Sequence, residues 1–152
     1  MAETIFDALR ESHVRQRSLC RKLLRSSPRT RRRLELFTEL RIELAAHEAA
    51  EERFLYVPML MTDAGLDPSR HALHEHHELD ELVEELQVVD HAGAAWMATA
   101  RKLSEKVHHH LREEERKFFQ SAGKLLTARQ KTAHAGRYRR DFERMRRKLL
   151  AE

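Results

Sequence analysis

The chain has 152 residues, 36% of them charged, and its formal net charge of +4 is too balanced to indicate a nucleic acid as a partner. With only four glycines and three prolines it lacks the turn residues of a β-rich fold, and its composition favours long helices in one compact domain. The single cysteine excludes an internal disulfide.

Five segments show apolar residues at the three-to-four spacing of amphipathic helices. Ser26-Ser27-Pro28 ends the first segment, and Pro58 with the stretch 62–65 ends the second. The third is expected to begin at Asp67-Pro68, because Asp can cap a helix and Pro fits its first turn. The expected helices cover about residues 4–25, 30–56, 67–89, 95–121 and 127–150.

The fifth segment begins with Thr127 and Gln130 at the spacing of a capping box. Because the other four segments are long, amphipathic and joined by short connections, they predict an all-α fold, an up-down four-helix bundle over about 4–121. The short additional C-terminal helix would then complete a single domain over 1–152.

Ionisable residues interrupt the apolar stripes of the four bundle helices. In the second helix His47 and Glu51 lie between leucines, and in the fourth His110 and Glu114 lie between Val107 and a phenylalanine. Each pair is four residues apart, which places both side chains on one helix face. Burying such groups without a partner costs several kcal/mol, roughly, and a bound cation would offset that cost.

The other two helices each offer one histidine on the stripe, His13 in the first and His76 in the third, with His77 as the substitute for His76. Two carboxylates with several imidazoles suit Fe or Mn, and Zn is a further candidate. The sequence therefore predicts a metal site with the ligands His13, His47, Glu51, His76, His110 and Glu114.

A metal-free interpretation competes with this one. His13 could be a hydrogen-bonded core histidine, and each His–Glu pair could lie on a solvated face, although the flanking leucines argue against exposure. Tyr56 could lie near the metals, but it is expected to close the core, and Cys20 is expected to be a buried structural thiol rather than a redox sensor. The remaining acids near the motifs are expected to be mostly solvated: Glu48, Glu52, Glu113 and Glu115.

The four motifs, in this order and spacing, resemble the hemerythrin-like, or HHE cation-binding, family. The resemblance covers the chain to about residue 126. It implies a non-haem di-iron protein with two oxo- or hydroxo-bridged iron ions that binds, senses or reacts with dioxygen, peroxide, nitric oxide or iron. The chain departs from the family pattern at Ser12, where Asp is common, and at Gln120, where Pro is common.

The most informative departure is Ala72, which stands one turn before the third-helix histidine. Oxygen-carrying hemerythrins have a second histidine there, so the resemblance implies more open metal positions in this chain. That favours a site that reacts with or senses its ligand over reversible oxygen storage. An oxidase or a peroxidase- or catalase-like activity is compatible with such a site.

An alternative function uses the basic surface. Arg31-Arg32-Arg33 and the run 137–148 could make the chain a regulatory or partner-binding helical module. These runs lack a DNA-reading motif and interleaved aromatics, so they are better interpreted as solvated helix faces. We expect no nucleic-acid partner and a monomer or weak homodimer.

The cellular compartment is predicted by looking for two kinds of apolar segment, signal peptides and membrane spans. No leading apolar stretch resembles a signal peptide, and no apolar run is long enough to cross a bilayer. We therefore expect a cytoplasmic protein without a membrane partner, in a compartment that keeps thiols reduced.

Overall fold

Helices make up nearly all of residues 2–152, the part of the chain that the computed structural model describes, and this part contains no strand. The all-α prediction is therefore confirmed. The elements in chain order are α1 (Ile5–Leu24), α2 (Arg31–Glu51), the π-helical turn η1 (Glu52–Tyr56), α3 (Val57–Leu60), α4 (Asp63–Val88), α5 (Ala94–Glu113), the π-helical turn η2 (Glu114–Phe118), α6 (Phe119–Leu125) and α7 (Ala128–Ala151).

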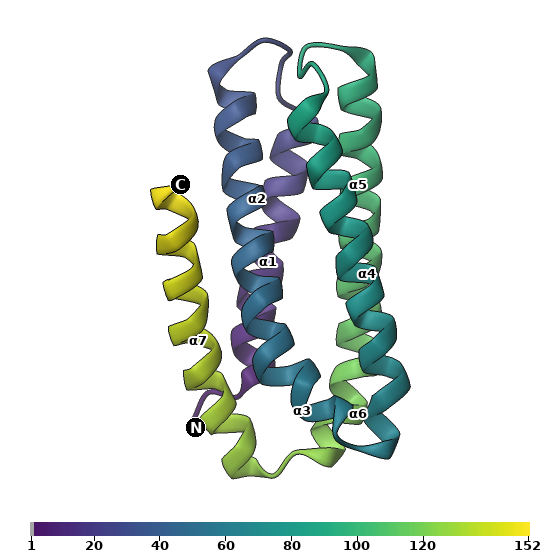
Figure 1. Ribbon diagram of the computed structural model, residues 1–152, viewed down its shortest axis with the longest axis vertical. Helices are drawn as coiled ribbons and strands as arrows, with labels where there is room; N and C mark the ends of the chain where they lie inside the picture. Colours follow the sequence, from purple (N-terminus) through teal and green to yellow (C-terminus); the bar gives the residue numbers. More distant parts are fainter. Residues whose placement is uncertain (1) are drawn as a thin grey trace.

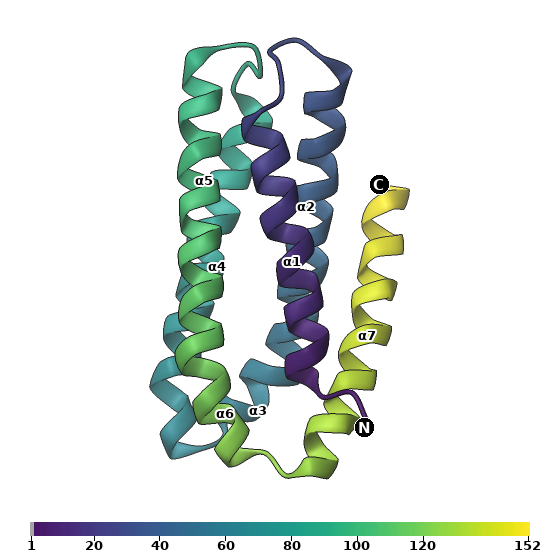
Figure 2. The same ribbon diagram turned by 180° about the vertical axis from the view of Figure 1, so that it is seen from behind.

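The helices α1, α2, α4 and α5 lie side by side along the long axis of the molecule (Figure 1). The connections α1–α2 and α4–α5 lie at one end, and α3 and α6 lie at the other (Figure 2). The last helix, α7, packs along α1 and α2 on the outside of this group. Within residues 2–152, no helix combines the length and apolar character needed to span a bilayer.

Threonines begin most of the long helices. Thr4, Thr30, Thr62 and Thr127 each accept a hydrogen bond from a backbone N–H in the first turn. The capping box predicted at Thr127 is present.

The predicted start of the third helix is wrong, because α4 begins at Asp63 and Pro68 lies inside it. Thr62 supplies the stronger cap, with its hydroxyl 2.9 Å from the Gly65 nitrogen. A side chain at Gly65 would collide with the Met59 carbonyl, so glycine permits the tight α3–α4 turn.

The apolar core consists of two clusters. One contains Leu9, Leu55 and Phe118, and the other contains Cys20, Trp96 and Leu103. The predicted ligand residues lie between these clusters along the helices and are all buried. The fold therefore contains a polar layer enclosed by apolar packing at both ends.

Cys20 is buried in the second cluster, and burial raises the pKa of its thiol to about 12. Since the thiolate is the reactive form, we expect iodoacetamide at pH 8 to leave the folded protein unlabelled and to label it in guanidinium. Mass spectrometry of the two samples measures the difference. Equal labelling rates in the two samples would contradict the burial of this thiol.

Candidate metal centre

Two π-helical turns mark the positions of the His-x-x-x-Glu motifs. The turn η1 begins directly after Glu51, and η2 begins at Glu114. The Val57 N–H donates to the Glu52 carbonyl, and the Phe119 N–H donates to the Glu114 carbonyl, so each bond spans five residues. Single π turns inside helices are frequent at functional sites. The two His-x-x-x-Glu motifs are thus each followed by the same π-helical distortion of the backbone.

All six predicted ligand residues converge between the helices and form two overlapping groups. The α1/α2 half-site comprises His13, His47, Glu51 and Glu114, and the α4/α5 half-site comprises His76, His110 and the same two glutamates. In each half-site, one ligand atom per residue lies within 4.8 Å of all the others. Glu51 and Glu114 are therefore shared by the two half-sites.

The imidazoles turn their Nε2 atoms toward the shared carboxylates. His13 Nε2 is 3.2 Å from Glu114 Oε1, and His76 Nε2 is 3.2 Å from Glu51 Oε1. The corresponding distances are 3.3 Å for His47 to Glu51 and 3.6 Å for His110 to Glu114. The two half-sites therefore present the same donor set, two imidazole nitrogens with two carboxylates.

Three of the four imidazoles have a partner for the outward Nδ1 atom. Glu115 Oε2 lies 2.7 Å from His13 Nδ1, and Glu75 Oε1 lies 2.9 Å from His110 Nδ1. His47 Nδ1 lies 2.8 Å from the Tyr138 hydroxyl, which comes from α7. Such contacts hold the proton on Nδ1 and leave Nε2 free to bind a cation.

The ionisable groups of the site shift one another's pKa values. Burial acts to lower the pKa of His13, but the carboxylates of Glu114 and Glu115 outweigh it and raise that pKa to about 9. Burial and the charge of Glu51 raise the pKa of Glu114. In the metal-free protein, bound protons therefore offset part of the negative charge that a cation would otherwise offset.

The unpaired atoms of the site fit a metal. His13 Nε2, His47 Nε2, Glu51 Oε2 and Glu114 Oε1 are buried and make no hydrogen bond, although the two imidazole nitrogens lie 3.2–3.3 Å from carboxylate oxygens; Glu48 Oε1 and His76 Nδ1 are also unpaired. An unpaired buried polar atom costs about 1–3 kcal/mol, and more when it is charged. The first four are atoms of predicted ligand residues, and nitrogen and oxygen donors together suit iron, manganese or zinc. The donor set therefore fits two divalent or trivalent cations.

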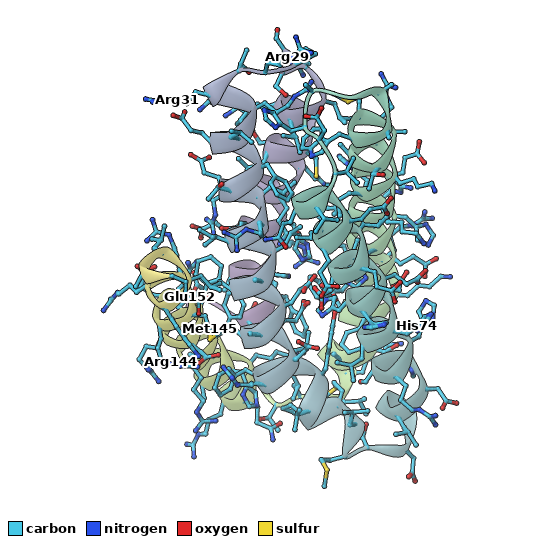
Figure 3. All side chains as sticks on the ribbon, turned by 45° about the horizontal axis from the view of Figure 1, so that its top comes forward. Arg29, Arg31, His74, Arg144, Met145 and Glu152 are labelled. Carbon is cyan, nitrogen blue, oxygen red and sulfur yellow. The ribbon has the colours of Figure 1, made fainter. Side chains whose placement is uncertain are left out.

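The structure separates the two candidate histidines of the third helix. His76 is buried in the α4/α5 half-site, whereas the His77 side chain is 67% exposed and pairs with Glu81. His74, expected at the surface, points away from the bundle (Figure 3).

Two acids and one tyrosine differ from expectation. Glu48 is buried rather than solvated, and Glu115 binds both His13 and Arg17. The Tyr56 hydroxyl lies 2.9 Å from Glu51 Oε1, and it also contacts Glu114 Oε2, so this residue belongs to the site as well as to the core.

A pocket of about 320 Å³ opens beside the α4/α5 half-site. It lies between α4 and the continuous helix formed by α5, η2 and α6. The buried residues His110, Glu114, Ala72 and Phe118 form its inner part, and the exposed Lys117 lies at its mouth. The pocket thus connects solvent to two of the predicted ligand residues.

Comparisons with known proteins agree with this geometry. The family described as "Hemerythrin HHE cation binding domain" matches residues 4–122. The crystal structure of a hemerythrin HHE cation binding domain-containing protein from Mycobacterium kansasii is similar, with a TM-score of 0.88 and 21% sequence identity. The alignment covers 97% of this chain and 90% of that chain, and at this identity it shows the fold alone. A search among curated proteins finds no match.

Proposed function

The chain belongs to the hemerythrin HHE cation-binding family, and from that premise we propose that it is a non-haem di-iron protein that reacts with or senses a small oxygen or nitrogen ligand. In this proposal α1, α2, α4 and α5 form an up-down bundle around two iron ions, and α7 is an additional helix. The observation that carries it is the pair of buried half-sites that share Glu51 and Glu114.

Each residue has a role in this proposal. Glu51 and Glu114, which belong to both half-sites, would hold both ions, His13 and His47 would hold one of them, and His76 and His110 would hold the other. When bound, the ions supply Lewis-acid and redox chemistry to a ligand such as dioxygen, peroxide or nitric oxide.

Tyr56 is the proton donor closest to both half-sites. Burial and the charges of Glu114 and Glu51 raise the pKa of its phenol, so the hydroxyl keeps its proton at neutral pH. Its hydroxyl donates to the Glu51 and Glu114 carboxylates, and its oxygen lies 3.3 Å from His76 Nε2. We propose that Tyr56 uses its one proton to orient these two carboxylates, which belong to both half-sites.

The chemistry is tested by adding hydrogen peroxide, dioxygen or nitric oxide to the iron-loaded protein and recording absorption spectra. We expect at least one of the three to change the near-ultraviolet and visible bands, and the same additions to metal-free protein to change nothing. Unchanged spectra with all three ligands, in protein that holds two irons per chain, would contradict a reactive or sensing role.

The contact between the Tyr138 hydroxyl and His47 Nδ1 gives a prediction about the α1/α2 half-site. Replacing Tyr138 by phenylalanine removes the partner of His47 Nδ1, which is expected to weaken metal binding at the α1/α2 half-site by about 10–100-fold. The α4/α5 half-site should keep its affinity. Calorimetric metal titration distinguishes the two sites.

Phe142→Leu is the matched control for Tyr138→Phe. It perturbs the same helix beside Tyr138, whose ring centroid lies 6.0 Å away, but it removes no hydrogen bond to His47. An equal loss of affinity in the control would assign the effect to the docking of α7 rather than to the hydrogen bond.

The alternative role of the basic surface has less support. Arg139 pairs with Glu3 and Glu11, Arg144 pairs with Asp141, and Arg146 pairs with Glu143. Part of the positive charge of α7 is therefore matched by carboxylates, as expected of a solvated helix face. A regulatory or partner-binding module remains a prediction, tested by salt-dependent retention on immobilised DNA.

A further inference from the structure

The outer partner of His47 differs in kind from those of two other imidazoles. At His13 and His110 the Nδ1 atom faces a carboxylate, and an ionised carboxylate only accepts hydrogen bonds. Such a partner holds the imidazole proton on Nδ1 by itself. His47 Nδ1 instead faces the Tyr138 hydroxyl at 2.8 Å. Because a hydroxyl can donate or accept, this contact alone allows the His47 proton to lie on either ring nitrogen.

The position of that proton decides whether His47 can bind a metal. A neutral imidazole carries one proton, and only its other nitrogen can act as a ligand. If Tyr138 donates to Nδ1, the proton lies on Nε2, the atom that is 3.3 Å from Glu51 Oε1 in the half-site. If Tyr138 accepts from Nδ1, the Nε2 atom is free for a cation.

A buried chain of hydrogen bonds leads from Tyr138 to a carboxylate. Burial raises the pKa of the Tyr138 phenol, and a hydrogen bond with the Ser12 hydroxyl acts to lower it, so the two hydroxyls are in contact. Ser12 is fully buried in α1, and its hydroxyl donates to Glu43 Oε1 of α2 at 2.6 Å. The chain therefore runs from His47 through two hydroxyls to Glu43.

The groups around Glu43 fix the direction of this chain. Arg15 Nε donates to the same Glu43 oxygen at 3.2 Å, in an ion pair with the carboxylate. Because that carboxylate only accepts, the single proton of the Ser12 hydroxyl is committed to it. Gln16 Nε2 donates to Ser12 Oγ at 3.2 Å and does not compete for that proton. The Ser12 oxygen can then only accept from the tyrosine hydroxyl, which in turn can only accept from His47 Nδ1.

We propose that Glu43 is a positioning residue for the α1/α2 half-site: through the two hydroxyls it holds the proton of His47 on Nδ1 and leaves Nε2 free for a metal. Glu43 lies one turn before His47 on α2 and belongs to neither half-site. The inference rests on the proposed function, since it concerns a bound metal. It adds a carboxylate that acts on a ligand residue from two side chains away.

Glu43→Gln and Ser12→Ala test this role by calorimetric titration of the metal-free protein with ferrous iron under anaerobic conditions. Glutamine keeps the shape of the side chain but can donate as well as accept, and alanine removes the hydroxyl. Each variant should lower the metal affinity of the α1/α2 half-site by about tenfold and leave the α4/α5 half-site unchanged. Glu39→Gln makes the same change one turn earlier on α2, at an exposed position, and should bind metal as wild type does.

A double-mutant cycle separates this role from a structural one. In the Tyr138→Phe background the chain is already broken at His47, so the addition of Glu43→Gln should cause no further loss of affinity. If Glu43 instead acted through the packing of α1 against α2, its effect would add to that of Tyr138→Phe.

Proton NMR of the zinc-loaded protein, which is diamagnetic, gives a second readout at the atom concerned. The Nδ1 proton of His47 should shift upfield in Glu43→Gln, because the chain of acceptors loses its charge. The Nδ1 protons of His13 and His110 should keep their resonances, because each has its own carboxylate partner.

Three results would each overturn the inference alone. They are wild-type metal affinity in both Glu43→Gln and Ser12→Ala, an equal loss from Glu43→Gln with and without Tyr138→Phe, and an unmoved His47 resonance. Wild-type protein that binds fewer than two metals would overturn the proposed function as well.

Discussion

Replacing Glu51 by alanine is expected to remove both bound metals, whereas replacing His13 by alanine should remove only one. Glu51 belongs to both half-sites, and His13 belongs to the α1/α2 half-site alone. Removing a residue that hydrogen-bonds to a metal ligand lowers metal affinity by about 10–100-fold. Removing a ligand residue that belongs to both half-sites should therefore lower the affinity by more than ~100-fold at both positions. Metal analysis of variants expressed with iron measures the outcome.

His77→Ala is the matched control for these variants. It removes an imidazole next to the site in sequence, but the His77 side chain is exposed and pairs with Glu81. The variant should therefore retain two metals per chain, whereas His76→Ala should lose one. Equal metal contents in Glu51→Ala and His13→Ala would contradict the shared role of Glu51.

Glu114→Gln is expected to stabilise the metal-free protein and to destabilise the metal-loaded protein relative to wild type. Because burial and Glu51 raise the folded-state pKa of Glu114 above its unfolded value, the charged carboxylate weakens folding at neutral pH. The neutral amide avoids this penalty, and the protonated His13 keeps Glu115 as a partner at 2.7 Å, so the metal-free variant should gain about 1 kcal/mol, which raises the Tm by a few degrees.

Bound metal is expected to reverse which of the two proteins, wild type or Glu114→Gln, is the more stable. At free metal 100 times the dissociation constant, each occupied site stabilises the folded state by about 2.7 kcal/mol, and Glu114→Gln weakens both sites. Calorimetry with chelator and with saturating metal measures the crossover. Glu105→Gln, at an exposed position of α5, is the control and should follow wild type in both conditions. The same order of Tm values in both conditions would contradict a metal role for Glu114.

The spacing of the motifs was enough to predict which ionisable residues converge. Residues four apart share a helix face, so His47 with Glu51 and His110 with Glu114 followed from the apolar stripes around them. His13 was predicted from a single stripe position. His76 was preferred to His77 because it lies on the apolar stripe of the third helix, and adjacent residues point about 100° apart around a helix.

The π turns explain why Tyr56 was expected to close the core rather than to belong to the site. In a regular helix, a residue five positions after Glu51 is rotated away from it by about 140°. The turn η1 brings the Tyr56 hydroxyl to within 2.9 Å of Glu51 Oε1 instead. A π turn has no clear signal in one sequence, so this contact depended on the structure.

Contacts between distant segments were missed for a different reason. Glu115 reaches His13 across 102 residues of chain, and Tyr138 reaches His47 across 91. These contacts depend on how α1 and α7 dock, and the helical stripes do not specify docking angles. The Glu48 carboxylate, next to a predicted ligand residue in the sequence, was expected to be mostly solvated, but the structure buries it.

The central claim is that one chain binds two metal ions in half-sites that share Glu51 and Glu114. Titrating metal-free wild-type protein with ferrous iron under anaerobic conditions, followed by calorimetry, tests it most directly. We predict that binding saturates at two equivalents per chain, and that Glu51→Ala abolishes both. Saturation at one equivalent or none would contradict the account.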